Sequence, residues 1–200
     1  MMTLQKIYAT REEWLTAALE EFRAVFAAQA SPIPTKVRVT CGFPSTARRS
    51  GAIGECWADT ASADKSMEIM VSPVLSDAYR VIDVLVHELC HTTAGAMNHG
   101  IAFRKVADAM HLIPAAGKAG YKATTGGDAF KQAFGAIIDG LGEYPHAQLS
   151  MSTRKVQATR MLKAVCPTCG YTVRLTHKWA AKGLPTCHLD GDTFALTAGA

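Results

Sequence analysis

The chain has 200 residues, 48% of them hydrophobic, which is enough to bury a core and excludes a disordered chain. It has no apolar run of about 18 residues and no secretory stretch at its start, so we expect a cytoplasmic protein without a membrane span. In that reducing compartment the six cysteines are expected to be free thiols or metal ligands. The net charge of +4 is unevenly spread: residues 1–147 carry 14 basic and 15 acidic groups, and residues 148–200 carry 7 and 2.

The first part of the chain predicts a helix followed by three short strands. Apolar residues recur at spacings of three and four over residues 11–28, and Thr10 with Glu13 forms a capping-box pattern at the start. Three runs with alternating or β-branched residues predict strands over residues 36–41, 54–58 and 67–71. We expect these strands to form a small, mostly antiparallel sheet.

Three further helices are expected, over residues 76–94, 101–110 and 130–141. Residues 113–127 are rich in Gly, Ala and Thr and predict a loop. From Tyr144 onward the chain has no acidic residue until Asp190. This change in composition predicts a core of residues 1–147 and a basic appendage of residues 148–200, in which short strands flank a Cys-Pro-Thr-Cys turn.

The sharpest motif is His87-Glu88-Leu89-Cys90-His91 on the second predicted helix. Four residues make slightly more than one helical turn, so His87 and His91 project from one face, as two ligands of a zinc ion require. Glu88 can then accept a proton from a metal-bound water without itself binding the metal. The alternative is a set of hydrogen-bonded polar residues on a core helix, which would need buried partners for all three side chains.

A catalytic zinc site needs a third protein ligand. We expect this ligand to be His99, because Gly95 and Gly100 permit the chain to reverse toward the helix. Asp108 and His111, on the following helix, are the alternatives.

The motif at 87–91, followed by Asn98-His99-Gly100 and Phe103-Arg104-Lys105, resembles the SprT-like zinc metallopeptidases, relatives of the Spartan protease, in their short bacterial and viral form. The resemblance implies an α+β fold with a compact zincin-like core: a helix, a small three-stranded sheet and a metal-bearing helix pair. It also implies hydrolysis of peptide bonds in DNA-associated proteins. Zincins commonly hold the peptide along an edge strand, and residues 67–71 are our candidate, although an ordinary core strand is an equal alternative.

The appendage carries a second metal-binding pattern. Cys166 and Cys169 place two thiolates on one turn, and Cys187 follows 18 residues later. Asp190 has the matching spacing for a fourth ligand and His188 is the alternative, with His177 a more distant one. This segment resembles the zinc ribbon of SprT-like proteins, and a degenerate ribbon without zinc is the alternative interpretation.

Basic residues surround Tyr171 and Trp179 in the appendage, which is the usual composition of a non-specific DNA-binding surface. The alternative is a solvated basic face. The candidate DNA-binding residues are Arg154, Lys155, Arg160, Lys163, Arg174, Lys178 and Lys182.

Together these patterns predict a zinc-dependent metallopeptidase with Glu88 as general base, acting on protein substrates associated with DNA. A non-catalytic nucleic-acid-binding adaptor with a structural zinc core is the alternative, and a zinc hydrolase of non-peptide amides is a weaker one. No residue is marked as the oxyanion stabiliser, although Tyr121, Tyr144 and His146 are candidates.

Overall fold

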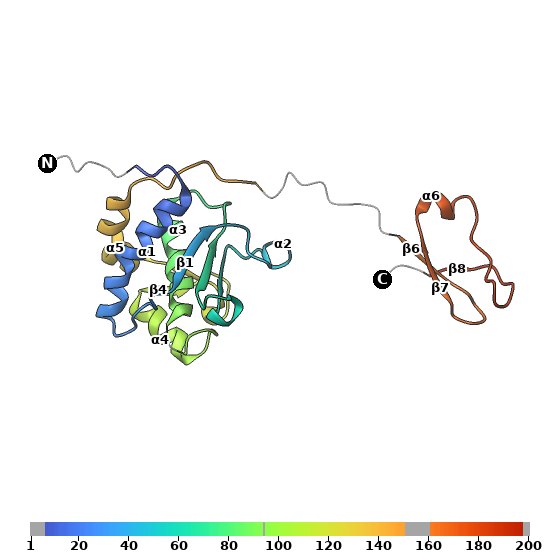
Figure 1. Cartoon of the computed structure of the whole chain (residues 1–200), viewed down its shortest axis with the longest axis horizontal. Helices are drawn as coiled ribbons and strands as arrows, with labels where there is room; N and C mark the ends of the chain where they lie inside the picture. Colours follow the sequence, from blue (N-terminus) through green and yellow to red (C-terminus); the bar gives the residue numbers. More distant parts are fainter. Residues whose placement is uncertain (1–6, 94, 151–160, 198–200) are drawn as a thin grey trace. The chain divides into compact units, whose positions relative to one another are not determined.

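The computed structural model describes residues 7–93, 95–150 and 161–197 of the chain. It divides into two compact units, Met1–Met151 and Ser152–Ala200, each with its own small β-sheets and helices (Figure 1). Among the described residues, no helix combines the length and the apolar character needed to cross a bilayer.

Helix α1 (Arg11–Ala28) confirms the first predicted helix. The Thr10 side chain accepts a hydrogen bond from the Glu13 amide, and the Glu13 carboxylate accepts one from the Thr10 amide, so both halves of the capping box are formed. The apolar stripe of the helix is fully buried against the sheet and α5, and it consists of Trp14, Leu15, Ala18, Leu19, Phe22 and Phe26.

The first sheet contains β1 (Val37–Cys41), β2 (Gly54–Trp57) and β3 (Met67–Val71) in the order β1-β3-β2. The β2–β3 pair is antiparallel, but β1 and β3 are parallel, so the expectation of a mostly antiparallel sheet is wrong. The segment 42–53, which includes the short helix α2 (Ala47–Ser50), carries the chain past the β3 position to the far edge. Our candidate edge strand is therefore the central one, and β2 forms an edge.

One face of this sheet is buried and the other faces solvent. Alternate residues of β1 and β3, such as Val39 and Ile69, are buried beneath the helices. On the outer face Arg38 donates hydrogen bonds to Asp64 and Glu68. Helices α1 and α3 both contact this sheet and pack on its buried face, and α3 carries the histidine motif.

Helices α3 (Ala78–Thr92), α4 (Ile101–Ala109) and α5 (Asp128–Leu141) confirm the other three predicted helices. Residues 113–127 are not a simple loop. Strands β4 (Leu112–Pro114) and β5 (Thr124–Gly126) form an antiparallel pair joined through a short 3₁₀ turn at Gly120–Lys122. Strands of three residues are too short to show the alternation of polar and apolar residues by which a strand is predicted.

The second unit is a three-stranded antiparallel sheet in the order β7-β6-β8. Strands β6 (Leu162–Val165) and β7 (Thr172–Leu175) match the two predicted strands, whereas helix α6 (His177–Ala180) and strand β8 (Ala195–Leu196) were not predicted. The unit has a minimal core, made of Ala164, Cys166, Cys187 and Phe194. So small a core stabilises a fold weakly, and such units usually rely on a metal or disulfides.

Candidate metal centre and catalytic site

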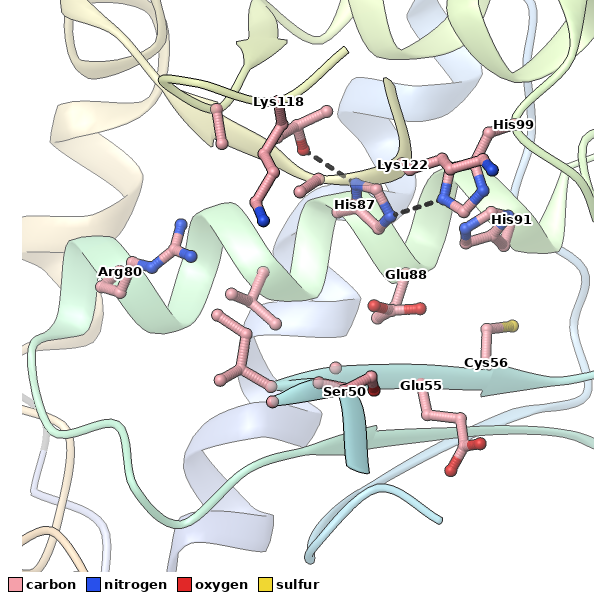
Figure 2. Close-up of a pocket in the computed structure, with 18 of the residues that line it drawn as sticks. Ser50, Glu55, Cys56, Arg80, His87, Glu88, His91, His99, Lys118 and Lys122 are labelled. Atoms are coloured by element: carbon pink, nitrogen blue, oxygen red, sulfur yellow. Dashed lines mark hydrogen bonds between the residues drawn. The ribbon is translucent and has the colours of Figure 1, made fainter. Parts of the chain in front are cut away.

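His87 and His91 lie one turn apart on α3, with ring centroids separated by 5.1 Å. The helix ends at Thr92, and Gly95 adopts a positive φ of 75°, a conformation that glycine reaches without strain. The chain then turns back and places His99 beside the helix, with its Nε2 atom 3.2 Å from Nε2 of His87 (Figure 2). The structure thus brings together the three histidines of the sequence hypothesis.

The spacing of these ring nitrogens fits a zinc ion. One ligand nitrogen from each of His87, His91 and His99 can be chosen so that all three lie within 4.8 Å of one another. Nitrogen ligands about 2.0–2.1 Å from a tetrahedral zinc are about 3.3 Å apart, close to the 3.2 Å between His87 and His99.

Hydrogen bonds orient two of the rings. Nδ1 of His91 lies 2.9 Å from the carbonyl oxygen of Ala96; because a carbonyl only accepts, Nδ1 carries the proton and Nε2 keeps its lone pair. Nδ1 of His87 lies 2.8 Å from Oγ1 of Thr124 on β5. Such outer partners fix the tautomer and orientation of metal-binding histidines.

Phe103 of α4 packs against all three imidazoles. Its ring centroid is 4.9 Å from that of His87, 4.4 Å from that of His91 and 4.9 Å from that of His99, and its side chain is fully buried. The phenyl ring therefore forms an apolar floor that restricts how the imidazoles can move.

Burial sets the protonation of the site. It is the main cause that lowers the pKa of His87 to about 3 and that of His91 to about 4, and it also lowers the pKa of His99. All three rings are consequently neutral at physiological pH, which is the form that binds metal ions. Burial, with a smaller contribution from Glu55, raises the pKa of Glu88 to about 8 in the absence of a metal.

The histidines and Glu88 face one cavity of about 710 Å³. Figure 2 shows Glu88 between the imidazoles and strand β2, with its carboxylate directed toward the strand. The walls come from residues 50–53, strand β2, helix α3, the connection after α3 that carries Met97 and His99, and the β4–β5 connection. An acid that is 6% exposed thus shares a cavity with three neutral imidazoles.

The alternative ligands lie elsewhere. Asp108 accepts a hydrogen bond from the hydroxyl of Tyr121, and His111 packs against Phe134 at 5.9 Å between ring centroids. Neither belongs to the histidine group. The residues that line the cavity also do not include Tyr121, Tyr144 or His146, the three oxyanion candidates.

Several residues of this site escaped the sequence patterns. Thr124 lies 37 residues after the histidine it contacts, and Arg80, Lys118 and Lys122 line the cavity from α3 and the β4–β5 connection. Gly54 also lines it, from β2. Arg80 lies on α3 itself, seven residues before His87, whereas only the tertiary fold brings the other positions to the histidine motif.

The second unit gathers Cys166, Cys169, Cys187 and Asp190, whose ligand atoms lie within 4.8 Å of one another. Hydrogen bonds from the thiols, led by that of Cys169, lower the pKa of Asp190. Of the three options for the fourth ligand, the structure groups Asp190, and neither His188 nor His177, with the cysteines.

Two turns of the same form carry these four residues. In the first, the Gly170 amide donates to the Cys166 carbonyl at 3.0 Å; in the second, the Gly191 amide donates to the Cys187 carbonyl at 2.9 Å. Both glycines have positive φ angles, 74° and 81°. Asp190 therefore occupies in its turn the place that Cys169 occupies in the other.

Three of the described basic residues of this unit lie near an exposed tryptophan, Trp179. Arg174, Lys182 and Trp179 line one hollow, and Nζ of Lys178 is 5.5 Å from the centroid of the Trp179 ring. Lys163 lies opposite Arg174 in the β6–β7 register. The other three candidate DNA-binding residues lie outside the described residues, and they are Arg154, Lys155 and Arg160.

Two separate groups of side chains, one of histidines and one of three cysteines with an aspartate, are therefore compatible with zinc. The histidine group shares its cavity with a buried glutamate. No protein-family model, curated protein or solved structure matches this chain.

Proposed function

We propose that the protein is a zinc-dependent metallopeptidase of the SprT-like kind, with a zincin-like core and a zinc-ribbon appendage. The observation that carries the proposal is the convergence of His87, His91 and His99 in one cavity with Glu88. A zinc ion held by the three histidines would lower the pKa of water to about 7 and polarise a carbonyl group.

Glu88 is suited to the proton transfers of peptide hydrolysis. It lies next to His87 in the chain, lines the same cavity and has no hydrogen-bond partner among the described residues that would hold it elsewhere. In the proposed reaction it accepts a proton from the attacking water and passes it to the leaving amine. A peptide bond breaks, and the products are a carboxylate and an amine.

Strand β2 is the proposed support for the substrate. It is an edge strand of the sheet, and Gly54, Glu55 and Cys56 line the cavity. An extended peptide can pair with the free backbone groups of such an edge, which leaves its side chains to enter neighbouring pockets.

The second unit supports the idea that the substrates are associated with DNA. Arg174, Lys178 and Lys182 lie near Trp179, which is 57% exposed, so phosphate neutralisation and base stacking are available on one surface. If the protein were instead a non-catalytic adaptor with a structural zinc core, it would bind DNA with the same surface and cleave nothing.

The test is reconstitution. The full chain would be stripped of metal with a chelator, reloaded with zinc and incubated with an unfolded protein such as casein, and with a DNA-binding protein with and without DNA. The proposal predicts fragments only after zinc is restored, and faster cleavage of the DNA-bound substrate. Binding of DNA by the zinc-loaded chain without cleavage of either substrate would favour the adaptor.

A further inference from the structure

The cavity has an excess of positive charge. Three of its lining residues are basic, namely Arg80, Lys118 and Lys122, and two are acidic, Glu55 and Glu88. The Glu55 carboxylate accepts hydrogen bonds from the amide and hydroxyl of Ser45 at 2.7 and 2.5 Å and is directed away from the histidines (Figure 2). Glu88 is therefore the one acid beside the imidazoles in this cavity, and it is assigned to the reaction.

Arg80 is held at the cavity by a buried carboxylate. Asp83, whose side chain is 7% exposed, accepts two hydrogen bonds from Nη1 of Arg80 at 2.6 and 2.8 Å. The same carboxylate accepts from the Thr125 hydroxyl and the Gly126 amide, each at 3.2 Å. Asp83 thereby joins α3 to β5 and holds Nη1 of the Arg80 guanidinium. Nε and Nη2 of Arg80 have no hydrogen-bond partner among the described residues and can bind another anion.

The two lysines project from an anchored connection. The Ala115 amide donates to the Ala123 carbonyl at 2.8 Å and closes the neck of the β4–β5 connection. Within it, the Tyr121 hydroxyl donates to Asp108 of α4, and the Arg104 guanidinium lies 5.3 Å from the centroid of the Tyr121 ring. The segment that carries the lysines is therefore tied to α4 through Tyr121, the residue before Lys122.

Both lysine side chains are available to a ligand. Lys118 and Lys122 are exposed, and neither forms an ion pair with any residue that the structure describes. In Figure 2 the amine of Lys118 is directed into the cavity on the side of Arg80, away from His99. Lys122 lies close enough to His99 for its charge to act on that ring, so the basic groups line the cavity on two sides. Neither amine is neutralised by an ion pair within the described residues.

We infer that Arg80, Lys118 and Lys122 form a basic subsite that lines the cavity and favours peptide substrates with a carboxylate, so that acidic peptides are preferred. The inference rests on the proposed peptidase function and names its substrate class. A cavity of about 710 Å³ accommodates a short stretch of extended peptide but not a DNA duplex, which is far wider. The carboxylate can come from a Glu or Asp side chain or from the C-terminus of the peptide.

Binding and cleavage are measured separately. A fluorescent peptide with one central Glu is compared with its Gln counterpart, each with a free or an amidated C-terminus, by anisotropy with the zinc-loaded full-length Glu88→Gln protein. We expect the Glu peptide to bind about tenfold more tightly at low salt, with the difference shrinking as salt screens the charges. A difference that depends instead on the free C-terminus supports the same subsite and assigns the carboxylate to the chain end.

Two further variants are made in the Glu88→Gln protein. One carries both Lys118→Gln and Lys122→Gln, and the control carries Lys105→Gln on the exposed face of α4. The double substitution should abolish the preference and the control should keep it. Equal affinity for all four peptides, or a preference that survives the double substitution, overturns the inference. So does a DNA oligonucleotide that displaces the peptides only when both lysines are present, because the subsite would then bind phosphate.

The same peptides given to the zinc-loaded native chain separate the two proposals. Cleavage of the Glu and Gln peptides at equal rates supports the proposed peptidase function and contradicts the inferred subsite. Selective binding with no cleavage of any peptide supports the subsite and contradicts the peptidase.

Discussion

Gly54 and Glu88 are in such close contact that position 54 has no room for a side chain. A Cβ atom built on Gly54 would lie 2.3 Å from Oε1 of Glu88 and 2.8 Å from Cγ1 of Val84. Both distances are below any real carbon contact, and the backbone of β2 therefore passes directly against the carboxylate. Strand β2 can approach the proposed general base this closely only because residue 54 has no side chain.

Replacement of Gly54 by alanine should therefore displace the Glu88 carboxylate. We expect peptidase activity to fall by about 100-fold, since a shift of about 1 Å in a catalytic group has effects of that order. The zinc content should not change, because the atoms nearest to a Cβ at position 54 belong to Glu88 and Val84 and not to the histidines. Gly140→Ala is the control, since a Cβ there meets nothing within 4 Å. Full activity in Gly54→Ala would show that the carboxylate does not need its present position.

Thr124→Val removes the hydroxyl that contacts Nδ1 of His87 and keeps the shape of the side chain. Loss of such an outer partner typically weakens metal binding by about 10- to 100-fold, and we expect zinc affinity to fall within that range. Competition with a chromophoric chelator measures the change, and Thr124→Ser, which keeps the hydroxyl, serves as the control. An unchanged affinity in the valine variant would mean that the ring is oriented by packing alone.

Phe103→Ala would open a cavity beneath the imidazoles. Truncation of a buried phenylalanine generally costs about 3–5 kcal/mol, and Phe103 is fully buried. We expect the free energy of unfolding in denaturant to fall by that amount in the metal-free protein. Phe103→Leu, which keeps most of the apolar volume, should lose distinctly less. A small loss for the alanine variant would indicate that neighbouring side chains close over the space.

Asp190→Cys should tighten zinc binding in the second unit, because a thiolate is a softer ligand than a carboxylate and Asp190 occupies the place equivalent to Cys169. Asp190→Ala should weaken it. His188→Ala tests the alternative ligand and should leave the affinity as it is. Chelator competition measured on the three variants decides the matter: a weakened His188→Ala with a normal Asp190→Ala would reverse the assignment.

Local patterns accounted for the helices better than for the sheets. The capping box at Thr10 and the apolar stripe of α1 depend on neighbours in the chain, and so does the pair His87 and His91. The position of β3 between β1 and β2 depends on which distant segments pair, and no periodicity carries that information. For this reason the edge strand was assigned wrongly although all three strands were expected.

The same distinction applies to the site. His99 could be proposed because Gly95 lies between it and the helix, and Asp190 because its spacing from Cys187 repeats that of the Cys166–Cys169 turn. Thr124, Gly54 and Lys118 could not, since each reaches the cavity from a separate element far along the chain. Candidate metal ligands can be recognised from their spacing along the chain. The residues that orient these ligands or line the cavity have no such regular spacing.

The most direct test of the central claim is the rate of cleavage of a quenched fluorescent peptide by zinc-loaded wild-type protein and by the Glu88→Gln variant, with zinc content matched by mass spectrometry. Glutamine keeps the shape of the side chain but cannot accept the proton of the attacking water. We predict that the variant retains its zinc and loses activity by at least about 100-fold, the lower range for loss of a general base. A variant that holds zinc and cleaves at the wild-type rate would contradict the proposed role of Glu88 and the metallopeptidase mechanism built on it.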